Sequence, residues 1–310
     1  MIVARELVKR YGDTVAVDGL SFRVEPGRVT GFLGPNGAGK STTLRMLLGL
    51  DAPTSGAALI DGVAYRDLPA PTRRVGALLD PGAVDLGLTA AGHLLWQARA
   101  AGIGRARVTE VLGLVGLEGL GGRRIRHLSL GMRQRLGIAA ALLGDPGILV
   151  LDEPLNGLDP EGIVWVRRLL RGFADEGRTV LLSSHLMNEM EATADHVLVI
   201  AKGRPVADIG VAELAAGARE RVEVATPRPS ELAALLLDAG STVVPGETGR
   251  LVVTGPDAAR VGELAAAHGI VLHALIPVRA RLEDAFMSLT GEGTGKTTPD
   301  REVGEGEPAR

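Results

Sequence analysis

Residues 34–42 read GPNGAGKST, and this stretch decides the fold. It follows a short apolar run, RVTGFLG at 28–34, and leads into KSTTLRMLLGL at 40–50, which has helical spacing. The backbone N–H groups of a glycine-rich turn point inward and form a nest for an anion. The start of the following helix adds the positive end of its dipole. The order strand, glycine loop, helix therefore predicts a phosphate-binding loop.

Four side chains add chemistry to this loop. The Lys40 ammonium can reach the β- and γ-phosphates of a nucleotide, and the Ser41 hydroxyl can ligate Mg²⁺. A second motif, ILVLDEP at 148–154, is an apolar run that ends in two carboxylates. A buried strand here places Asp152 beside the phosphate loop as a second Mg²⁺ ligand. It also places Glu153 where it can polarise an attacking water, so the two motifs together predict nucleotide hydrolysis.

The chain up to about residue 217 alternates between strand and helix patterns, which predicts an α/β fold with a parallel sheet covered on both faces. Short apolar strands are predicted at 28–34, 147–152, 179–184 and 196–201. A strand pair is predicted at 2–9 and 14–24, closing on a turn at Pro26-Gly27. Helices are predicted at 40–50, 89–101, 107–117 and 131–144, the last with Ser129 as its N-cap.

The pattern changes after residue 217. Residues 218–290 are predicted to form a second, smaller unit with β-α-β-β-α-β order, as in a ferredoxin-like domain, and a short helix at 281–289. The tail at 291–310 has five glycines and two prolines and is predicted to be disordered. Its stretch GEGTGKTT at 291–298 is rejected as a second phosphate loop, because its glycine spacing is one residue short and no strand precedes it.

Composition excludes several classes of protein. The 310 residues suit one large and one smaller domain, and the net charge of −3 argues against nucleic acid as the main partner. The chain has no cysteine, which excludes disulfides and thiolate metal sites. The start MIVARELVKRYGD lacks the pattern of a secretion signal, and no apolar run reaches the roughly 18 residues of a spanning helix. The sequence therefore predicts a cytoplasmic protein.

Six short elements occur in an order that resembles the ATP-binding subunits of ABC transporters over about residues 2–217. They are RYG at 10–12, GPNGAGKST at 34–42, LSLGMRQR at 128–135, LVLDEP at 149–154, NGLD at 156–159 and SSH at 183–185. The resemblance implies a P-loop ATPase core with a helical subdomain at about 81–140. It implies that ATP and Mg²⁺ are bound.

The resemblance also assigns roles to individual residues. It implies that Tyr11 stacks on adenine and that His185 is the switch histidine. The Walker A loop that would hold the phosphates comprises Gly34, Pro35, Asn36, Gly37, Ala38, Gly39, Lys40, Ser41 and Thr42. Ser129 and Gly131 stand at a predicted helix N-terminus and can form a further anion site. In this family such a site binds the ATP of the partner subunit, which implies a head-to-tail homodimer with two nucleotides between the subunits.

The sequence departs from the family at one position of the site. The family carries a glutamine at the end of a strand after Walker A, whereas the matching stretch VGALLDPG at 75–82 holds Asp80. The two glutamines of the chain, Gln97 and Gln134, fall in predicted helices. A carboxylate can still ligate Mg²⁺, but an ionised one cannot donate a hydrogen bond to water. We expect Asp80 to keep the metal contact and to alter coupling to the partner.

The signature LSLGMRQR has Leu130 and Met132 where the family has glycine and glutamine. Together with LEDAFMSLT at 282–290 it resembles ATPase subunits of daunorubicin- and bacitracin-type exporters. This implies an ATPase at the inner face of the cell membrane that powers a separate integral membrane permease and exports a drug, antibiotic or other small molecule.

Two other functions stay open at this point. A soluble ABC ATPase could act on ribosomes or DNA, but such proteins usually carry two cassettes or a long coiled coil, and this chain shows one cassette without a heptad run. A sensor that binds ATP without hydrolysis has little need for Glu153. The transported substrate is not encoded in any motif of the chain.

Overall fold

The phosphate loop follows the fourth strand of a six-stranded sheet with the order β5-β6-β7-β3-β8-β9. The computed structural model describes residues 1–217, 221–246 and 249–278; the predicted helix at 281–289 and the tail at 291–310 lie outside these ranges. The strands are β3 (Arg28–Leu33), β5 (Val75–Leu78), β6 (Ile148–Leu151), β7 (Thr179–Ser184), β8 (His196–Ala201) and β9 (Arg204–Gly210). The first five run parallel and β9 pairs antiparallel with β8, so the predicted parallel sheet is confirmed.

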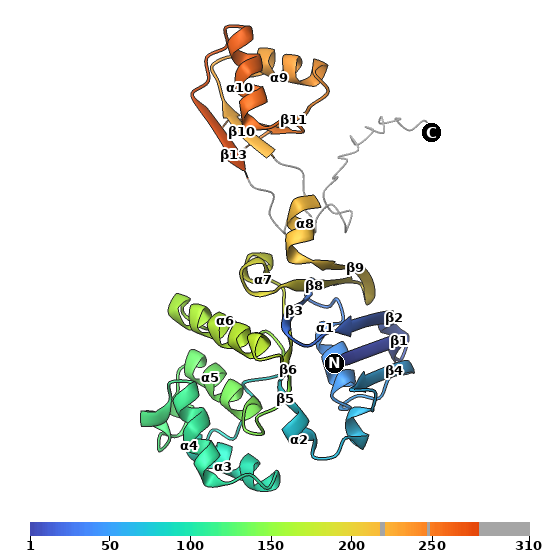
Figure 1. Cartoon of the computed structure of the whole chain (residues 1–310), viewed down its shortest axis with the longest axis vertical. Coiled ribbons are helices and arrows are strands. Elements are labelled where there is room, and N and C mark those ends of the chain that lie inside the picture. The colour runs from blue at the N-terminus through green and yellow to red at the C-terminus, as the bar shows by residue number, and fades with distance from the viewer. Residues whose placement is uncertain (218–220, 247–248, 279–310) are drawn as a thin grey trace, which may run out of the picture.

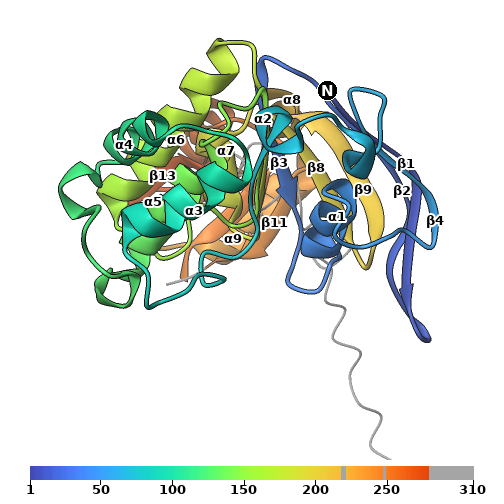
Figure 2. The ribbon, with the colours of Figure 1, turned by 90° about the horizontal axis from the view of Figure 1, so that it is seen from below.

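A second sheet has the order β2-β1-β4 and is antiparallel. Its strands are β1 (Ile2–Tyr11), β2 (Thr14–Val24) and β4 (Ser55–Ile60), which confirms the predicted strand pair and adds β4. The helix after the phosphate loop, α1 (Lys40–Leu47), lies between the two sheets (Figures 1 and 2). Leu44 and Leu47 of α1 are fully buried in one cluster with Phe22 and Phe32. This packing fixes the start of α1, and with it the loop.

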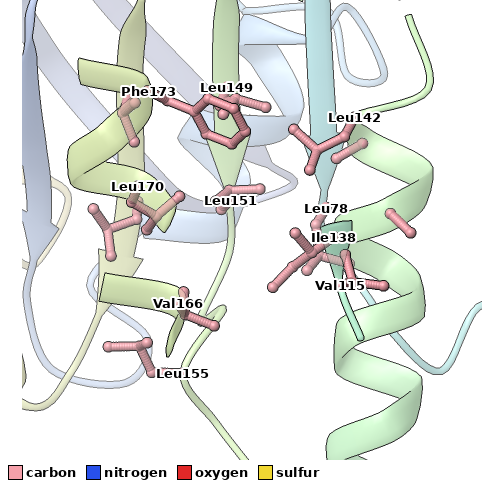
Figure 3. Packing of buried hydrophobic residues seen from close by; sticks show 14 of the residues in the cluster. Leu78, Val115, Ile138, Leu142, Leu149, Leu151, Leu155, Val166, Leu170 and Phe173 are labelled. Carbon is pink, nitrogen blue, oxygen red and sulfur yellow. The ribbon is translucent and has the colours of Figure 1, made fainter. Parts of the chain in front are cut away.

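The opposite face of the parallel sheet is covered by α5 (Leu130–Ala141), α6 (Pro160–Asp175) and α7 (Met187–Thr193). Helices α3 (Ala90–Ala100) and α4 (Arg105–Leu114) pack against α5. Figure 3 shows side chains of α5 and α6 turned toward those of β5 and β6. Along β6, Leu149 and Leu151 belong to the hydrophobic cluster formed with α5 and α6. Ile148 and Val150, on the other face of the strand, belong to the cluster around α1. Both faces of the strand are buried, which explains its unbroken apolar run.

This burial accounts for much of the stability of the domain. A leucine side chain removed from water contributes about 1.5–3 kcal/mol. Leu170 of α6 is almost fully buried, and its replacement by alanine would cost roughly 2–5 kcal/mol. Short elements complete this part of the chain: α2 (Pro71–Arg74), α8 (Val211–Gly217) and the 3₁₀ turns Tyr65–Asp67, Glu118–Leu120 and Ile125–His127. Within the described ranges no helix is long and apolar enough to cross a membrane.

The C-terminal segment forms a separate antiparallel sheet with the order β11-β12-β10-β13. Its elements are β10 (Arg221–Ala225), α9 (Pro229–Asp238), β11 (Thr242–Pro245), β12 (Leu251–Thr254), α10 (Ala258–Ala267) and β13 (Ala274–Val278). The predicted β-α-β-β-α-β order is confirmed. The apolar stretch IVLHALIPV at 270–278 predicts a longer last strand, but β13 begins only at Ala274, because the Ile270 N–H donates to the Ala265 carbonyl at the end of α10. The Ile270 side chain is buried in the core of this unit instead.

Candidate active site

The phosphate loop turns back sharply between β3 and α1. Gly39 has a φ of 103°, and a β-carbon there would lie 2.5 Å from the Ala16 carbonyl oxygen, so only glycine fits. The loop borders a hollow of about 250 Å³, which we call the phosphate hollow. It is lined by Ala16, Asn36, Gly37, Gly39, Lys40, Ser41, Thr42 and Glu153. The structure thus places Glu153 beside the phosphate loop, which lies more than a hundred residues earlier in the chain.

Lys40 supplies a buried cation to the phosphate hollow. Its ammonium donates to the Gly34 carbonyl at 2.7 Å and to the Pro35 carbonyl at 3.3 Å, and it lies 3.9 Å from a carboxylate oxygen of Glu153. Burial lowers the pKa of Lys40, and the carboxylates of Glu153 and Asp152 act in the opposite direction. A buried ammonium that donates to two carbonyls keeps a third N–H and a full positive charge for an anion.

Asp152 directly follows β6 and is almost fully buried. Its N–H donates to the Leu78 carbonyl at 2.7 Å, which ties it to the neighbouring strand β5. The Ser183 hydroxyl donates to the Asp152 carboxylate and accepts the Glu153 N–H at 3.0 Å. Ser183 was not singled out from the sequence, although it lies in the SSH stretch that pointed to His185. It orients both acidic residues at once.

Glu153 has an unusual backbone. Its φ is 48°, a left-handed conformation that costs a non-glycine residue energy and that occurs at functional sites. Its carbonyl accepts from the Gln134 side-chain amide at 3.2 Å and from the Asn156 N–H at 3.2 Å. Its carboxylate meets Nδ1 of His185, directly after β7, at 3.0 Å. The structure thus brings together Glu153 and His185, two residues that the sequence singled out separately, and it adds Gln134 as a contact that the sequence did not reveal.

Tyr11 ends β1 and about half of its surface is exposed. Its hydroxyl donates to the Asp51 carboxylate at 2.9 Å, and this bond raises the pKa of Tyr11. Asp51 is held in turn by Arg45 of α1 at 2.8 Å. The Lys9 ammonium lies 4.9 Å from the ring centroid, over one face of the ring. Tyr11 is fixed beside α1, but it is not one of the described residues that line the phosphate hollow.

Ser129 and Gly131 lie at a second, separate hollow. Ser129 is the N-cap of α5 as predicted, and its hydroxyl accepts the Met132 N–H at 3.2 Å. This signature hollow has a volume of about 450 Å³. Its lining is Gly116, Leu117, Leu120, Ser129, Leu130, Gly131, Met132, Arg135, Gly157, Leu158 and Asp159. Within the described chain the two hollows have no lining residue in common.

Asp80 lies two residues beyond β5 and is exposed. Its carboxylate accepts the Gly82 N–H at 2.7 Å, which closes a tight turn. It is not among the described residues that line the phosphate hollow. Its position after β5, next to the strand that carries Asp152, keeps it at the same edge of the sheet.

The donor set at this edge fits one kind of metal. Ser41 offers an exposed hydroxyl in the phosphate hollow and Asp152 a carboxylate. Among the described residues no group of three or more His, Asp or Glu side chains could hold a metal by itself. Mg²⁺ is commonly bound by one or two carboxylates together with phosphate oxygens and water. The site therefore suits Mg²⁺ that arrives with a nucleotide.

A glycine loop between strand and helix, a buried lysine and a carboxylate at the end of the neighbouring strand define a P-loop nucleotide-binding protein. The family described as "ABC transporter" matches residues 17–156, and a "Domain of unknown function (DUF8746)" matches residues 220–283. The bacitracin transport ATP-binding protein BcrA of Bacillus licheniformis is 44% identical over 212 residues, which cover 67% of this chain and 69% of that protein.

Further relatives extend the similarity along the chain. The Nod factor export ATP-binding protein I of Burkholderia pseudomallei is 38% identical over 303 residues, covering 93% of this chain and 96% of that protein. The solved "Dimeric Structure of MJ0796, a Bacterial ABC Transporter Cassette" has a TM-score of 0.63 at 26% identity, covering 68% of this chain and 99% of that one. The chain thus belongs to the ABC transporter family as an ATP-binding protein, and it is an ATPase.

Proposed function

We propose that this chain is the ATP-hydrolysing subunit of an exporter whose permease is a separate membrane protein. The transported substrate would be a drug, an antibiotic or another small molecule. The relatives named for bacitracin transport, lantibiotic transport and Nod factor export support this class of cargo. The observation that carries the proposal is the pair of separate hollows, because one suits hydrolysis and the other suits a nucleotide held by a second subunit.

Nucleotide binding falls to the loop Gly34–Thr42. When phosphates enter, the Lys40 ammonium can exchange the Gly34 and Pro35 carbonyls for the β- and γ-phosphate oxygens. The exposed ring of Tyr11, held by Asp51, offers an open face on which adenine can stack. This places the triphosphate at the start of α1 and the base near Tyr11, which Asp51 and Arg45 hold beside the last turn of α1.

Hydrolysis falls to Glu153. The oxygen of a water attacks the γ-phosphorus, the bond from that phosphorus to the bridging oxygen of ADP breaks, and Glu153 takes the proton of the water. His185 holds the Glu153 carboxylate by its 3.0 Å contact, and Ser183 holds the backbone. Ser41 and Asp152, with Asp80 as a further ligand, would hold Mg²⁺, which neutralises charge on the phosphate oxygens.

The signature hollow would bind ATP that is held by a second copy of the chain. Ser129 and Gly131 open a twelve-residue helix, whose N-terminus favours an anion. Because the phosphate loop of the same chain borders another hollow, the anion at Ser129 would come from ATP on the partner. Two copies related by a two-fold axis then enclose two ATP molecules. The related cassette solved as a dimer, and its post-hydrolysis dimer described as bound to ADP and Pi, support this arrangement.

The proposed domain boundary separates the two sheets formed by β1 to β9 from the sheet formed by β10 to β13. We assign residues 2–217 to the ATP-binding domain, with a helical subdomain at about 81–140, and residues 218–290 to an accessory domain. The separate sheet β11-β12-β10-β13 and the match at 220–283 support this boundary. The membrane partner would hold the chain at the inner face of the membrane.

A groove of about 550 Å³ offers a place for the permease. Its lining is Tyr65, Ala70, Pro71, Thr72, Val75, Gly76, Ala77, Trp96, Gln97, Ala100, Ala101, Ile103, Ala140, Leu143 and Gly144. Trp96 is 67% exposed there, which is unusual for a tryptophan unless a partner covers it. Exposed arginines at 66, 73, 74 and 99 adjoin the lining in sequence. An apolar permease segment flanked by acidic residues would match this groove.

A gentle detergent pull-down of the chain from its native membranes tests the proposal. A polytopic membrane protein recovered in about equal amount is the expected result, and Trp96→Glu should reduce its recovery. Val164→Glu is a matched control, since Val164 is an exposed apolar residue of α6 outside the groove. Recovery of ribosomes or DNA in place of a membrane protein would overturn the exporter assignment and favour a soluble ABC ATPase.

A further inference from the structure

Helix α5 joins the two hollows of one chain. Ser129 and Gly131 at its start line the signature hollow. One turn further on, Gln134 is buried, and its side-chain amide donates to the Glu153 carbonyl at 3.2 Å. Glu153 lines the phosphate hollow. A single helical turn therefore separates the proposed contact with the partner's ATP from a bond to the proposed catalytic glutamate.

The Glu153 backbone depends on bonds of this kind. A left-handed non-glycine residue persists only when its surroundings hold it in place. On one side the Glu153 N–H is held by Ser183, and on the other the carbonyl is held by Gln134 and by the Asn156 N–H. Ser183 and Asn156 lie in or next to the phosphate site, whereas Gln134 alone among these three belongs to α5. Gln134 is thus the link through which a movement of α5 reaches Glu153.

A second contact of α5 reaches the same segment. Leu130 lies one helical turn before Gln134, on the same face of α5. It occupies the space beside Gly157, where an added β-carbon would lie 2.7 Å from Leu130 Cγ. Between the two contacts, Leu155 is buried and packs near Val166 of α6 (Figure 3). The segment 153–157 is therefore anchored in the core at its middle and touched by α5 at both ends.

We infer that Gln134, supported by the Leu130–Gly157 contact, is a positioning residue that couples occupancy of the signature hollow to the orientation of Glu153 in the same chain. The inference rests on the proposed ATP-sandwich function. When the partner's ATP seats against Ser129 and Gly131, α5 takes a defined position, and its Gln134 bond then sets the Glu153 backbone for hydrolysis. Each ATP would thereby promote hydrolysis of the other.

The first test replaces Gln134 by leucine, which has a similar size and removes the donor. The expected result is unchanged ATP affinity and unchanged ATP-dependent dimerisation, a melting temperature lowered by only about 2–4 °C, and kcat reduced at least about tenfold, the effect of one lost hydrogen bond. Thr193→Val is the matched control, since Thr193 is a buried helical residue of α7 whose hydroxyl donates to the Glu189 carbonyl at 2.6 Å, and its kcat should match wild type.

The second test uses an exposed contact and includes the melting temperature of each variant. Gly157→Ala should lower kcat both by crowding Leu130 and by straining a backbone with a φ of 74°, and Leu130→Gly added to it should restore the part of the loss that crowding causes. Wild-type kcat in Gln134→Leu, or additive losses in the double variant, would overturn the inference. So would a parallel loss of dimerisation, because it would mean that Gln134 only stabilises the fold. Failure of the wild-type chain itself to hydrolyse ATP would instead refute the proposed function.

Discussion

The Ser183 hydroxyl contacts both acidic residues of the site, Asp152 and Glu153. It is fully buried, donates to the Asp152 carboxylate and accepts the Glu153 N–H. Ser183→Ala removes a hydrogen bond to a charged group, worth about 1.5–3 kcal/mol, and leaves a buried N–H unsatisfied at a cost of about 1–3 kcal/mol. We expect the free energy of unfolding to fall by roughly 3 kcal/mol, because part of each loss is recovered by relaxation.

The matched control is the neighbouring residue. Ser184 is also buried in β7, but its hydroxyl accepts only a neutral N–H, that of Leu186 at 2.9 Å. Ser184→Ala should therefore cost about 1 kcal/mol and leave kcat unchanged. Ser183→Ala should in addition lower kcat at least about tenfold at saturating ATP, because both acidic residues lose their orientation.

The assay combines denaturant unfolding with steady-state hydrolysis of both variants. A difference of about 2 kcal/mol in unfolding free energy between the two variants is expected, with the kcat loss confined to Ser183→Ala. If the two variants are equal in both measurements, the shared role of Ser183 in holding Asp152 and Glu153 is refuted.

Three further results are expected. Burial lowers the pKa of Lys40 below 10.5 in the free protein, and phosphate binding needs the protonated ammonium, so ATP affinity should fall as pH rises through that lowered pKa; a Kd at pH 10.5 equal to the Kd at neutral pH would contradict this. Asp51→Asn should bring the raised pKa of Tyr11 down toward 10.0, with Tyr65, whose pKa is raised by burial, as the internal control in a phenolate absorbance titration. Asp80→Gln should raise the Mg²⁺ concentration needed for half-maximal hydrolysis, and an unchanged Mg²⁺ requirement with unchanged activity would show that Asp80 contributes no ligand.

Local patterns were sufficient to predict the central elements. Strands β3 and β6 are buried on both faces, so their apolar runs are unbroken and easily found. The N-cap Ser129 was predictable because an N-cap interaction involves only the next three residues. By contrast β9 was missed, since RPVADIG is a partly exposed edge strand that begins next to a proline.

The contacts that orient the site could not be predicted. Gln134 bonds a carbonyl 19 residues away and Ser183 bonds a carboxylate 31 residues away. The residues next to Gln134 and Ser183 in the sequence do not indicate these partners, because both contacts form only when β6, β7 and α5 pack together. The sequence singled out Glu153 from its motif and His185 through resemblance to a family, but it did not predict the contact between them.

The central claim is that two copies of this chain enclose ATP and that Glu153 starts its hydrolysis. The most direct measurement is the size in solution of Glu153→Gln with and without ATP, alone and combined with Ser129→Arg. We predict a stable dimer of Glu153→Gln with ATP and little hydrolysis, and a monomer that still binds ATP once Ser129→Arg is added. Rapid turnover by Glu153→Gln, or an ATP-dependent dimer that tolerates Ser129→Arg, would contradict the account.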